Sequence, residues 1–323
     1  MRPRVVLVLA IAALLVGGIL LVPAAAAKLG AGDRTAAAAS ASAPPTIAPK
    51  VVEPPQPTLA PGPVNVAVDG FYAWALMDLD TGAISGSPNS ATETSSTESM
   101  IKSWIVSDYL RQIDEAGSPL TDSRKSQIQR AIRDSDDKAA SSLYSAAGGV
   151  ASTRRMISMC GLENSHLGKV PGYAGWWSFT EMSAQDVTRL GKCIQSGKAA
   201  GKKYTPLVLS EMTKVRGTTA AKDQFRTYGG GRWGIIDGLP KEIVANEGPI
   251  SIKNGWTPLV YDGNWHISCL AISKEWVLAV QTRYPAGKGL DYGAKVCAKT
   301  ATQLVTPKVG AALTIPASGA TQG

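Results

Sequence analysis

The strand-like segments of this 323-residue chain lie at the two ends of its folded part, and helix-like segments fill the middle. Phe71–Asp80 reads as a strand that turns into a second one at 83–85. Three more strand-like segments follow only near 249–257, 265–273 and 275–283. The N-terminal and C-terminal strands must therefore share one sheet. We predict an α+β fold with a five-stranded antiparallel sheet, because a βαβ fold would alternate strands with helices.

The middle of the chain shows helical periodicity. In the first predicted helix, Ile101, Ile105, Tyr109 and Ile113 recur on one face. An irregular segment at 161–181 interrupts the helices. The predicted helices cover about 99–116, 121–133, 136–147, 150–159, 183–196 and 205–215, with a last one at about 289–304.

The N-terminus carries an export signal. Arg2 and Arg4 precede an uncharged stretch from Val5 to Ala27, which as a helix would reach about 35 Å and could cross a bilayer core. The small residues at its end also suit signal-peptide cleavage. Residues 1–27 are therefore a signal peptide or a membrane anchor, and either one predicts an extracytoplasmic location.

The composition changes after this segment. Residues 28–63 are rich in Ala, Pro, Ser and Thr and lack hydrophobic periodicity, which predicts a disordered linker. We expect a folded domain over 64–305 and a disordered tail over 306–323. The net charge of +8 is dispersed along the chain, which argues against a nucleic-acid partner and is explained by solubility or by an anionic envelope. We expect a monomer.

Four cysteines in an exported chain predict two disulfides, among three pairings. Cys160 and Cys193 lie in neighbouring predicted helices, and Cys269 and Cys297 lie in a late strand and the last helix, so we favour these two pairs. Four free buried thiols are the alternative. The chain has no C-x-x-C and only two histidines, so we predict no metal site.

A motif with catalytic potential opens the first predicted helix. Ser99-Met100-Ile101-Lys102 matches S-x-x-K, and a spacing of three places both side chains on one helical face. A neutral lysine can take the proton of a serine hydroxyl and so activate it as a nucleophile. About one chance match per chain of this length is expected, and the alternative is a serine N-cap followed by a solvated lysine.

Two further short motifs follow in the chain. Ser135-Asp136-Asp137 lies between two predicted helices, and Lys253-Asn254-Gly255 lies on a strand of the closing sheet. Each is weak alone, since the first could be a helix cap and the second a strand end with an exposed lysine. Their order and context together favour a shared site, because S-x-x-K, S-D-x and K-x-G succeed one another in this way in penicillin-recognising enzymes.

With these motifs the chain resembles the superfamily of serine β-lactamases and penicillin-binding proteins, and most of all its class A β-lactamase-like branch. The resemblance covers about 64–305. It implies a sheet flanked by terminal helices and a reduced all-helical subdomain. It also implies that Ser99 is acylated, Lys102 takes its proton, Ser135 passes a proton to the leaving nitrogen and Lys253 attracts a substrate carboxylate. The backbone N–H groups of Ser99 and Trp256 would form the oxyanion hole.

The chain departs from the family pattern at two motif positions. Asp137 stands where Asn is expected, and Asn254 stands where Thr or Ser is usual. A carboxylate near Lys102 or Lys253 favours the charged lysine, so Lys102 would be a weaker base. Asn254 removes a hydroxyl that helps to hold a substrate carboxylate, but it keeps a hydrogen-bond donor.

The irregular segment shows a third departure. Class A β-lactamases activate water with a loop glutamate, but this loop has only Glu163 and Glu181, at its two ends and outside the E-x-x-x-N arrangement. We therefore expect a persistent acyl-enzyme. Trp176 and Trp177 on the loop could stack on a substrate, with core packing as the alternative. The predicted substrate-binding residues are Asp137, Asn254, Gly255, Trp256, Trp176 and Trp177.

These motifs predict an exported serine hydrolase that forms an acyl-enzyme on an amide, ester or β-lactam, such as a peptidoglycan stem peptide. The alternative is a non-catalytic envelope binding or sensor module. A Ser–His–Asp mechanism would need His166 or His266, and nothing in their spacing supports it. No cofactor is expected.

Overall fold

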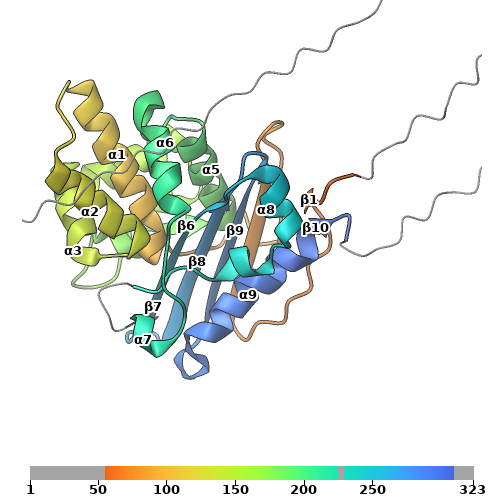
Figure 1. Cartoon of the computed structure of the whole chain (residues 1–323). Helices are drawn as coiled ribbons and strands as arrows, with labels where there is room; N and C mark the ends of the chain where they lie inside the picture. Colours follow the sequence, from red (N-terminus) through yellow and green to blue (C-terminus); the bar gives the residue numbers. More distant parts are fainter. Residues whose placement is uncertain (1–54, 225–228, 309–323) are drawn as a thin grey trace, which may run out of the picture. The chain divides into compact units, whose positions relative to one another are not determined.

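The structure, a computed structural model, describes residues 55–224 and 229–308. Its centre is a five-stranded antiparallel sheet with the strand order β3-β2-β9-β8-β7 (Figure 1). Strand β2 pairs with β9 along its whole length, so the N-terminal and C-terminal segments meet inside the sheet. The predicted α+β fold is therefore confirmed. The strands are β2 (Phe71–Asp78), β3 (Ile84–Gly86), β7 (Ser251–Leu259), β8 (Asn264–Ile272) and β9 (Trp276–Pro285).

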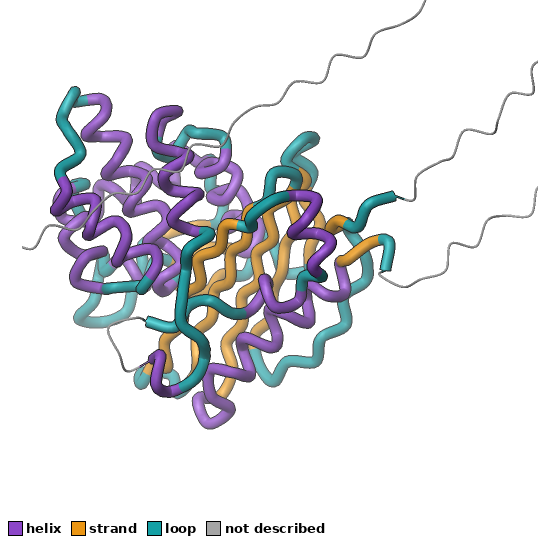
Figure 2. Tube along the Cα trace, in the orientation of Figure 1, coloured by secondary structure: helices purple, strands orange, loops and turns teal. Residues whose placement is uncertain are grey.

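Helices cover both faces of this sheet (Figure 2). Alternate residues of a strand face opposite sides, and strand β8 shows this directly. Cys269 is bonded to Cys297 of α9 (Gly289–Leu304), whereas Leu270 faces Gly191 of α5 (Ala184–Gln195). A Cβ atom at Gly191 would lie 2.4 Å from Cγ1 of Val277, so only glycine lets α5 approach the sheet this closely.

The helical block between the strands follows the predicted pattern, with small shifts of its ends. Helix α6 begins four residues earlier than predicted, and the short helices α7 and α8 that follow it were not predicted. The remaining helices are α1 (Lys102–Glu115), α2 (Asp122–Arg133), α3 (Asp137–Ala146), α4 (Val150–Cys160), α6 (Gly201–Met212), α7 (Ala221–Gln224) and α8 (Lys241–Glu247).

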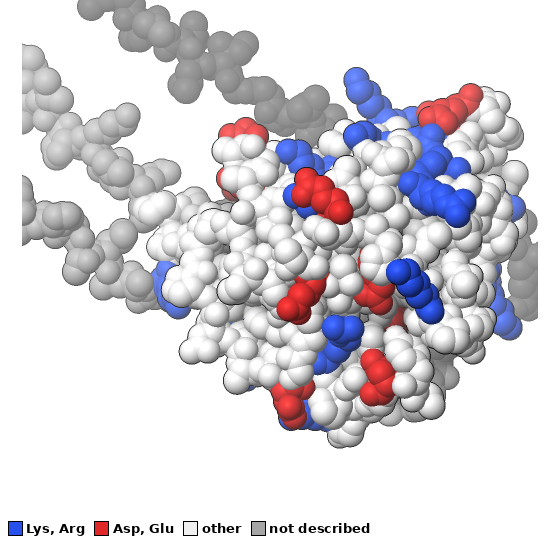
Figure 3. Space-filling model, turned by 180° about the vertical axis from the view of Figure 1, so that it is seen from behind, with Lys and Arg blue, Asp and Glu red and all other residues white. Residues whose placement is uncertain are grey.

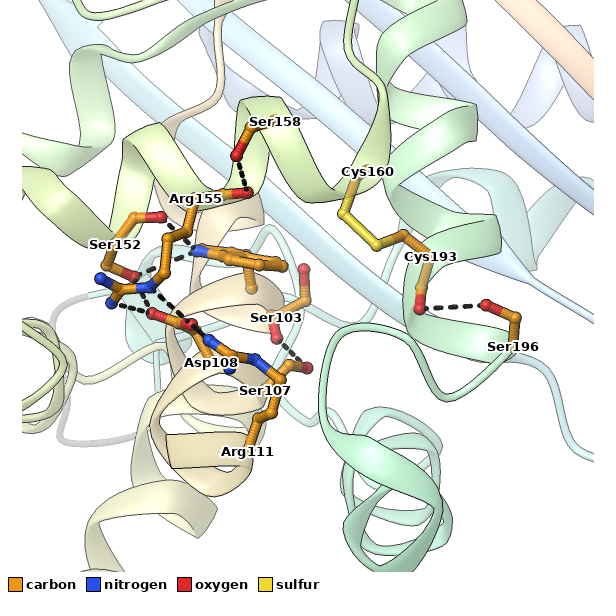
Figure 4. Close-up of a disulfide and its surroundings, with 11 residues drawn as sticks. Ser103, Ser107, Asp108, Arg111, Ser152, Arg155, Ser158, Cys160, Cys193 and Ser196 are labelled. Carbon is orange, nitrogen blue, oxygen red and sulfur yellow. Dashed lines mark hydrogen bonds and ion pairs between the residues drawn. A yellow bond between two sulfur atoms is a disulfide. The ribbon is translucent and has the colours of Figure 1, made fainter. Parts of the chain in front are cut away.

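The helical block is held together by covalent and ionic links (Figure 4). The Cys160–Cys193 disulfide joins the end of α4 to α5, and both predicted pairs are therefore confirmed. The fully buried Asp108 of α1 accepts hydrogen bonds from Arg155 and Ser152 of α4, at 2.6 Å each. A buried carboxylate is stable only with such partners.

Several short elements were not expected from the sequence. A second sheet has the order β4-β6-β5, with β4 (Thr94–Ser96), β5 (Ser165–His166) and β6 (Glu181–Ser183). Strand β1 (Thr58–Leu59) pairs with β10 (Val305–Thr306). Short 3-10 helices are η1 (Glu98–Ile101), η2 (Trp177–Phe179), η3 (Gly234–Gly238) and η4 (Ala286–Lys288).

The β1–β10 pair corrects both expected domain boundaries. The folded part begins by residue 58 instead of 64, and it extends to residue 306. Two-residue strands carry too weak a pattern to be found in a Pro- and Ala-rich segment. The predicted signal or anchor segment, most of the linker and most of the tail lie outside the described residues. Within the described ranges, no helix is long and apolar enough to span a membrane.

Charged side chains are dispersed over the face shown in Figure 3. Acidic residues lie among the basic ones, and uncharged surface separates most of them. On this face of the described part, the excess of positive charge forms no continuous stripe of the kind that follows a nucleic-acid backbone.

Candidate active site

The sequence predicted Ser99 at the start of an α-helix, but the structure places it in the 3-10 helix η1. The α-helix begins only at Lys102. Glu98 has a positive φ of 47°, which bends the backbone just before the serine. Met100 and Ile101 are fully buried and anchor η1 in the core. Ser99 itself is half-buried and lines a cavity.

Ser135 lines the same cavity and connects helix α1 to strand β7. It lies between α2 and α3, and its φ of 56° is unusual for a residue with a side chain. Its hydroxyl accepts hydrogen bonds from Nζ of Lys102 at 3.2 Å and from Nζ of Lys253 at 3.0 Å. One serine oxygen thus bridges two amines from distant parts of the chain. We call these three residues the lysine cluster.

Both amines of the lysine cluster are completely buried. Burial lowers the pKa of Lys102, and the nearby Asp137 carboxylate opposes this shift. Burial, and then the charge of Lys102, lower the pKa of Lys253 well below its usual range. Desolvation disfavours an ammonium ion, so the cluster is suited to hold at least one neutral amine.

Asp137 contacts the lysine cluster as the sequence suggested. Its Oδ1 atom accepts a hydrogen bond from Nζ of Lys102 at 2.6 Å, while 74% of its side chain is exposed. The carboxylate favours the charged lysine, as predicted, but burial has the larger effect on the Lys102 pKa. Asp137 thus reduces the lowering of the Lys102 pKa that burial causes, but it does not cancel it.

Gly255 allows strand β7 to pack against η1. A Cβ atom there would lie 2.2 Å from the carbonyl oxygen of Thr97 and 2.7 Å from the backbone nitrogen of Ser99. Any other residue would push the strand away from the serine. The next residue, Trp256, lines the cavity and donates a hydrogen bond to Gln224 Oε1 at 2.7 Å.

The structure contradicts the prediction that Asn254 contacts substrate. Its side chain is 1% exposed and points to the other face of the sheet. Its amide donates to the carbonyl oxygens of Gly231 at 3.0 Å and Trp233 at 2.7 Å. Strand alternation explains the difference, because Lys253 and Asn254 must face opposite sides. Asn254 therefore positions the segment before η3.

The cavity has a volume of about 450 Å³, which is within the range of small-molecule sites. It brings together six of the ten predicted site residues, which lie up to 157 positions apart in the sequence, counting from Ser99 to Trp256. Lys102, Lys253, Asn254 and Gly255 are not on its wall. It is lined by Glu98, Ser99, Ser135, Asp137, Tyr173, Trp176, Trp177, Ser178, Phe179, Gln224, Gly229, Trp256 and Thr257.

The two tryptophans of the loop have different surroundings. Trp176 is 46% exposed, whereas Trp177 is only 2% exposed. The Trp177 ring lies 5.1 Å from Nζ of Lys102, and its Nε1 donates to Ser141 at 3.3 Å. Trp177 is thus part of the core beneath the lysine cluster, and Trp176 is the one that a ligand could stack on.

The loop supplies no carboxylate to the cavity wall, as the sequence suggested. Glu163 is exposed and pairs with Arg189 at 2.9 Å. Glu181 lies on β6, opposite Ser96 of β4, and is not among the lining residues.

Glu98 is the site residue that the sequence interpretation missed. It lines the cavity next to Ser99, yet only 1% of it is exposed. Its oxygens accept hydrogen bonds from Ser96 at 2.7 Å and Thr257 at 2.6 Å. Burial raises its pKa to about 7. The only sequence signal was its place directly before the S-x-x-K motif.

The two histidines also differ. His166 is exposed on β5, whereas His266 of β8 is buried between Ser96 and Asp262. The position of His266 in the sequence did not predict these contacts with Ser96 and Asp262. Within the described residues, no three His, Cys, Asp or Glu side chains are placed to hold a metal ion.

Comparison with known proteins supports the fold. No protein-family model matches the chain. It is 25% identical over 222 residues to proteins described as "Putative lipoprotein LppW" from Mycobacterium bovis and Mycobacterium tuberculosis. The match covers 68% of this chain and 65% of each relative.

Solved structures match more of the chain at lower identity. PBP-A is 14% identical, with a TM-score of 0.52 over 78% of this chain and 89% of PBP-A. A class A β-lactamase from Mycobacterium abscessus is 15% identical, with a TM-score of 0.52 over 72% of this chain and 92% of the enzyme. A PBP-A mutant solved as an acyl-enzyme complex with penicillin G matches with a TM-score of 0.51 and 14% identity, over 72% and 88% of the two chains.

This chain has the β-lactamase/transpeptidase-like fold. The superfamily resemblance that the motifs suggested is thus confirmed at the level of the fold. Within this β-lactamase fold, the S-x-x-K serine and the S-D-x serine meet at one cavity, and the K-x-G lysine bonds to the second of these serines from behind the wall.

Proposed function

We propose that this protein is an extracytoplasmic serine hydrolase that forms an acyl-enzyme at Ser99 on an amide, ester or β-lactam. The lysine cluster behind Ser135 is the observation that carries this proposal. Two buried amines with lowered pKa values share one hydroxyl at the cavity that holds the serine. Such an arrangement can take a proton from a nucleophile and pass it on.

We propose the following roles for these residues. Neutral Lys102 takes the Ser99 proton as the oxygen attacks the carbonyl carbon. Ser135, bonded to both amines, passes a proton to the leaving nitrogen or oxygen, and Lys253 replaces it. Backbone N–H groups of Ser99 and Trp256 would hold the developing oxyanion. Trp176 would contact the part of the substrate that extends from the cavity.

Two observations support the location and the substrate class. Both cysteine pairs form disulfides, which persist in oxidising compartments, and the curated relatives are described as lipoproteins. The penicillin G complex of the PBP-A mutant shows that this fold can be acylated by a β-lactam. A β-lactam or a peptidoglycan stem peptide is therefore the substrate class that we propose.

Slow release of the acyl group is part of the proposal. Glu163 and Glu181 do not line the cavity, so the loop offers no base for water. A purified sample should therefore accumulate a covalent adduct and hydrolyse a chromogenic β-lactam slowly.

Covalent labelling tests the proposal. The purified protein is incubated with a fluorescent penicillin and analysed by gel and intact mass. We expect one adduct in the wild type and none in Ser99→Ala. Ser178→Ala is the matched control, because Ser178 lines the same cavity, and it should still be labelled.

The non-catalytic module remains the second candidate, because the ion pair between Lys102 and Asp137 favours a charged lysine. A thermal shift with penicillin but no covalent adduct would support that module and contradict the hydrolase.

A further inference from the structure

A chain of hydrogen bonds leads from the cavity wall to the protein surface. Glu98 Oε1 accepts a hydrogen bond from Ser96 Oγ at 2.7 Å. Ser96 Oγ lies 2.8 Å from Nδ1 of His266, whose Nε2 lies 2.7 Å from Oδ2 of Asp262. Glu98 borders the cavity directly before Ser99, and Asp262 has 28% of its side chain exposed. We call Glu98, Ser96, His266 and Asp262 the carboxyl relay.

The relay can hold one proton at either of two places. Ser96 has a single hydroxyl proton. If it donates this proton to Glu98, then Nδ1–H of His266 donates to Ser96, and the imidazole is charged beside Asp262. If Glu98 is protonated and donates to Ser96, the hydroxyl donates to a neutral His266. Both arrangements contain the same number of protons, so a proton can pass between Glu98 and His266 without a change of partners.

Burial shifts the pKa values at the two ends of this exchange in opposite directions. It raises the Glu98 pKa to about 7, helped by the nearby Glu181 and Asp137 carboxylates and opposed by the hydrogen bonds from Thr257 and Ser96. Burial also lowers the His266 pKa, which Asp262 opposes and Arg283 reinforces. Glu98 therefore changes its protonation state near neutral pH, and burial favours the neutral form of His266.

Two more ionisable groups, Tyr261 and Lys102, interact with the relay. The Tyr261 ring packs against His266 with centroids 6.1 Å apart, and burial raises its pKa to about 12, so it stays neutral. Lys102, the lysine of the S-x-x-K motif that directly follows Glu98, interacts electrostatically with it, and the Glu98 charge raises the Lys102 pKa. Deprotonation of Glu98 thus favours the ammonium form of Lys102.

We propose that Glu98 is the general base for hydrolysis of acyl-Ser99, and that Ser96, His266 and Asp262 carry its proton to the surface. This inference rests on the proposed function. A water oxygen bonds to the ester carbonyl carbon, and one water proton passes to the Glu98 carboxylate. The tetrahedral intermediate breaks its bond to Ser99 Oγ, which takes a proton from the Lys102 ammonium. The products are a carboxylic acid, free Ser99, neutral Lys102 and protonated Glu98. Glu98 releases its proton along the relay, and Lys253 takes up from solvent the proton that it gave through Ser135 during acylation, which restores the starting form.

The same contacts explain why this hydrolysis is slow. Both Glu98 oxygens already accept hydrogen bonds, from Ser96 and Thr257, and the carboxyl is largely protonated below pH 7. Release of the acyl group should therefore accelerate as the pH rises through about 7.

A pulse–chase experiment tests the base. The protein is acylated with fluorescent penicillin, and loss of the adduct is followed by intact mass between pH 5 and 9. Glu98→Gln should be labelled like the wild type but release the acyl group about 100-fold more slowly, without the rise near pH 7. Glu163→Gln, which removes an exposed loop carboxylate, should behave like the wild type.

The outcomes separate the two proposals. If the wild type forms no adduct, the proposed function and the hydrolytic step both fail. If the adduct forms and Glu98→Gln releases it with the wild-type rate and pH profile, only the carboxyl relay is overturned.

A second measurement needs no substrate. The chain has two histidines, so ¹⁵N NMR of the imidazole rings separates His266 from the exposed His166. Glu98→Gln should change the His266 tautomer or its titration midpoint and leave His166 unchanged. If the tautomer and the titration midpoint of His266 are both unchanged in Glu98→Gln, no proton is shared along the relay.

Discussion

The lysine cluster and the carboxyl relay border the same cavity from different parts of the fold. The cluster joins α1, the turn before α3 and strand β7. The relay joins η1, strand β4 and strand β8. In the cluster, burial lowers the pKa values of two amines, and in the relay it raises the pKa of a carboxyl to about 7. Desolvation favours the neutral form in both.

The difference lies in what balances the buried charge. Lys102 has the exposed carboxylate of Asp137 as its partner. Glu98 accepts hydrogen bonds from the hydroxyl groups of Ser96 and Thr257, and from no cationic side chain among the described residues. The ion pair stabilises the charged form of the Lys102 amine. The hydrogen bonds from two hydroxyl groups stabilise the charged form of the Glu98 carboxyl less than burial destabilises it. The cavity thus combines a base that takes the serine proton with an acid–base group that changes state near neutral pH.

The largest effect should come from removing the hydroxyl that unites the lysine cluster. Ser135→Gly keeps the positive φ without strain but removes Oγ, so no proton can pass between the amines and the leaving group. We expect acylation by fluorescent penicillin to slow by about 10²- to 10⁴-fold. Ser145→Ala, at an exposed position of α3, the helix that follows Ser135, is the control. Labelling of Ser135→Gly at the wild-type rate would mean that the cluster transfers no proton.

The next effect concerns stability and belongs to the relay. Because Glu98 has a folded-state pKa of about 7, above its ordinary value of 4.5, the folded state binds the proton more tightly. Its contribution to stability is complete below pH 4.5 and is lost as the pH rises to 7, by roughly 3 kcal/mol. Urea unfolding at several pH values should show this loss in the wild type and its absence in Glu98→Gln. Equal pH dependence in both proteins would contradict the raised pKa.

The smallest effect should come from the ion pair on the cluster. Asp137 raises the Lys102 pKa, so Asp137→Asn should lower it and move the rise of the acylation rate to lower pH. Asp122→Asn, in the first turn of the neighbouring helix α2, should leave the profile unchanged. A profile that is the same in Asp137→Asn and the wild type would show that Lys102 is not the base.

Much of the fold was predictable because its signals are local. An even number of cysteines needs only the composition, and the strand-like segments at the two ends of the folded part and the helical periodicity between them depend on nearby residues. The same holds for Ser99, Lys102, Ser135 and Lys253, whose motifs have fixed spacing. Asn254 was misjudged because its neighbour Lys253 faces the cluster, and alternate strand residues face opposite sides.

The sequence by itself determined the fold class and the motif that holds the serine, since short-range pattern and residue chemistry suffice for these. It favoured the two disulfide pairs, and the tertiary structure decided them. Only the tertiary structure decided that Ser135 bridges two buried amines and that Glu98 is linked through Ser96 to His266. Those contacts join residues from separate elements, and their pKa shifts arise from burial. Burial is a property of the packed fold, and no single segment of the chain contains it.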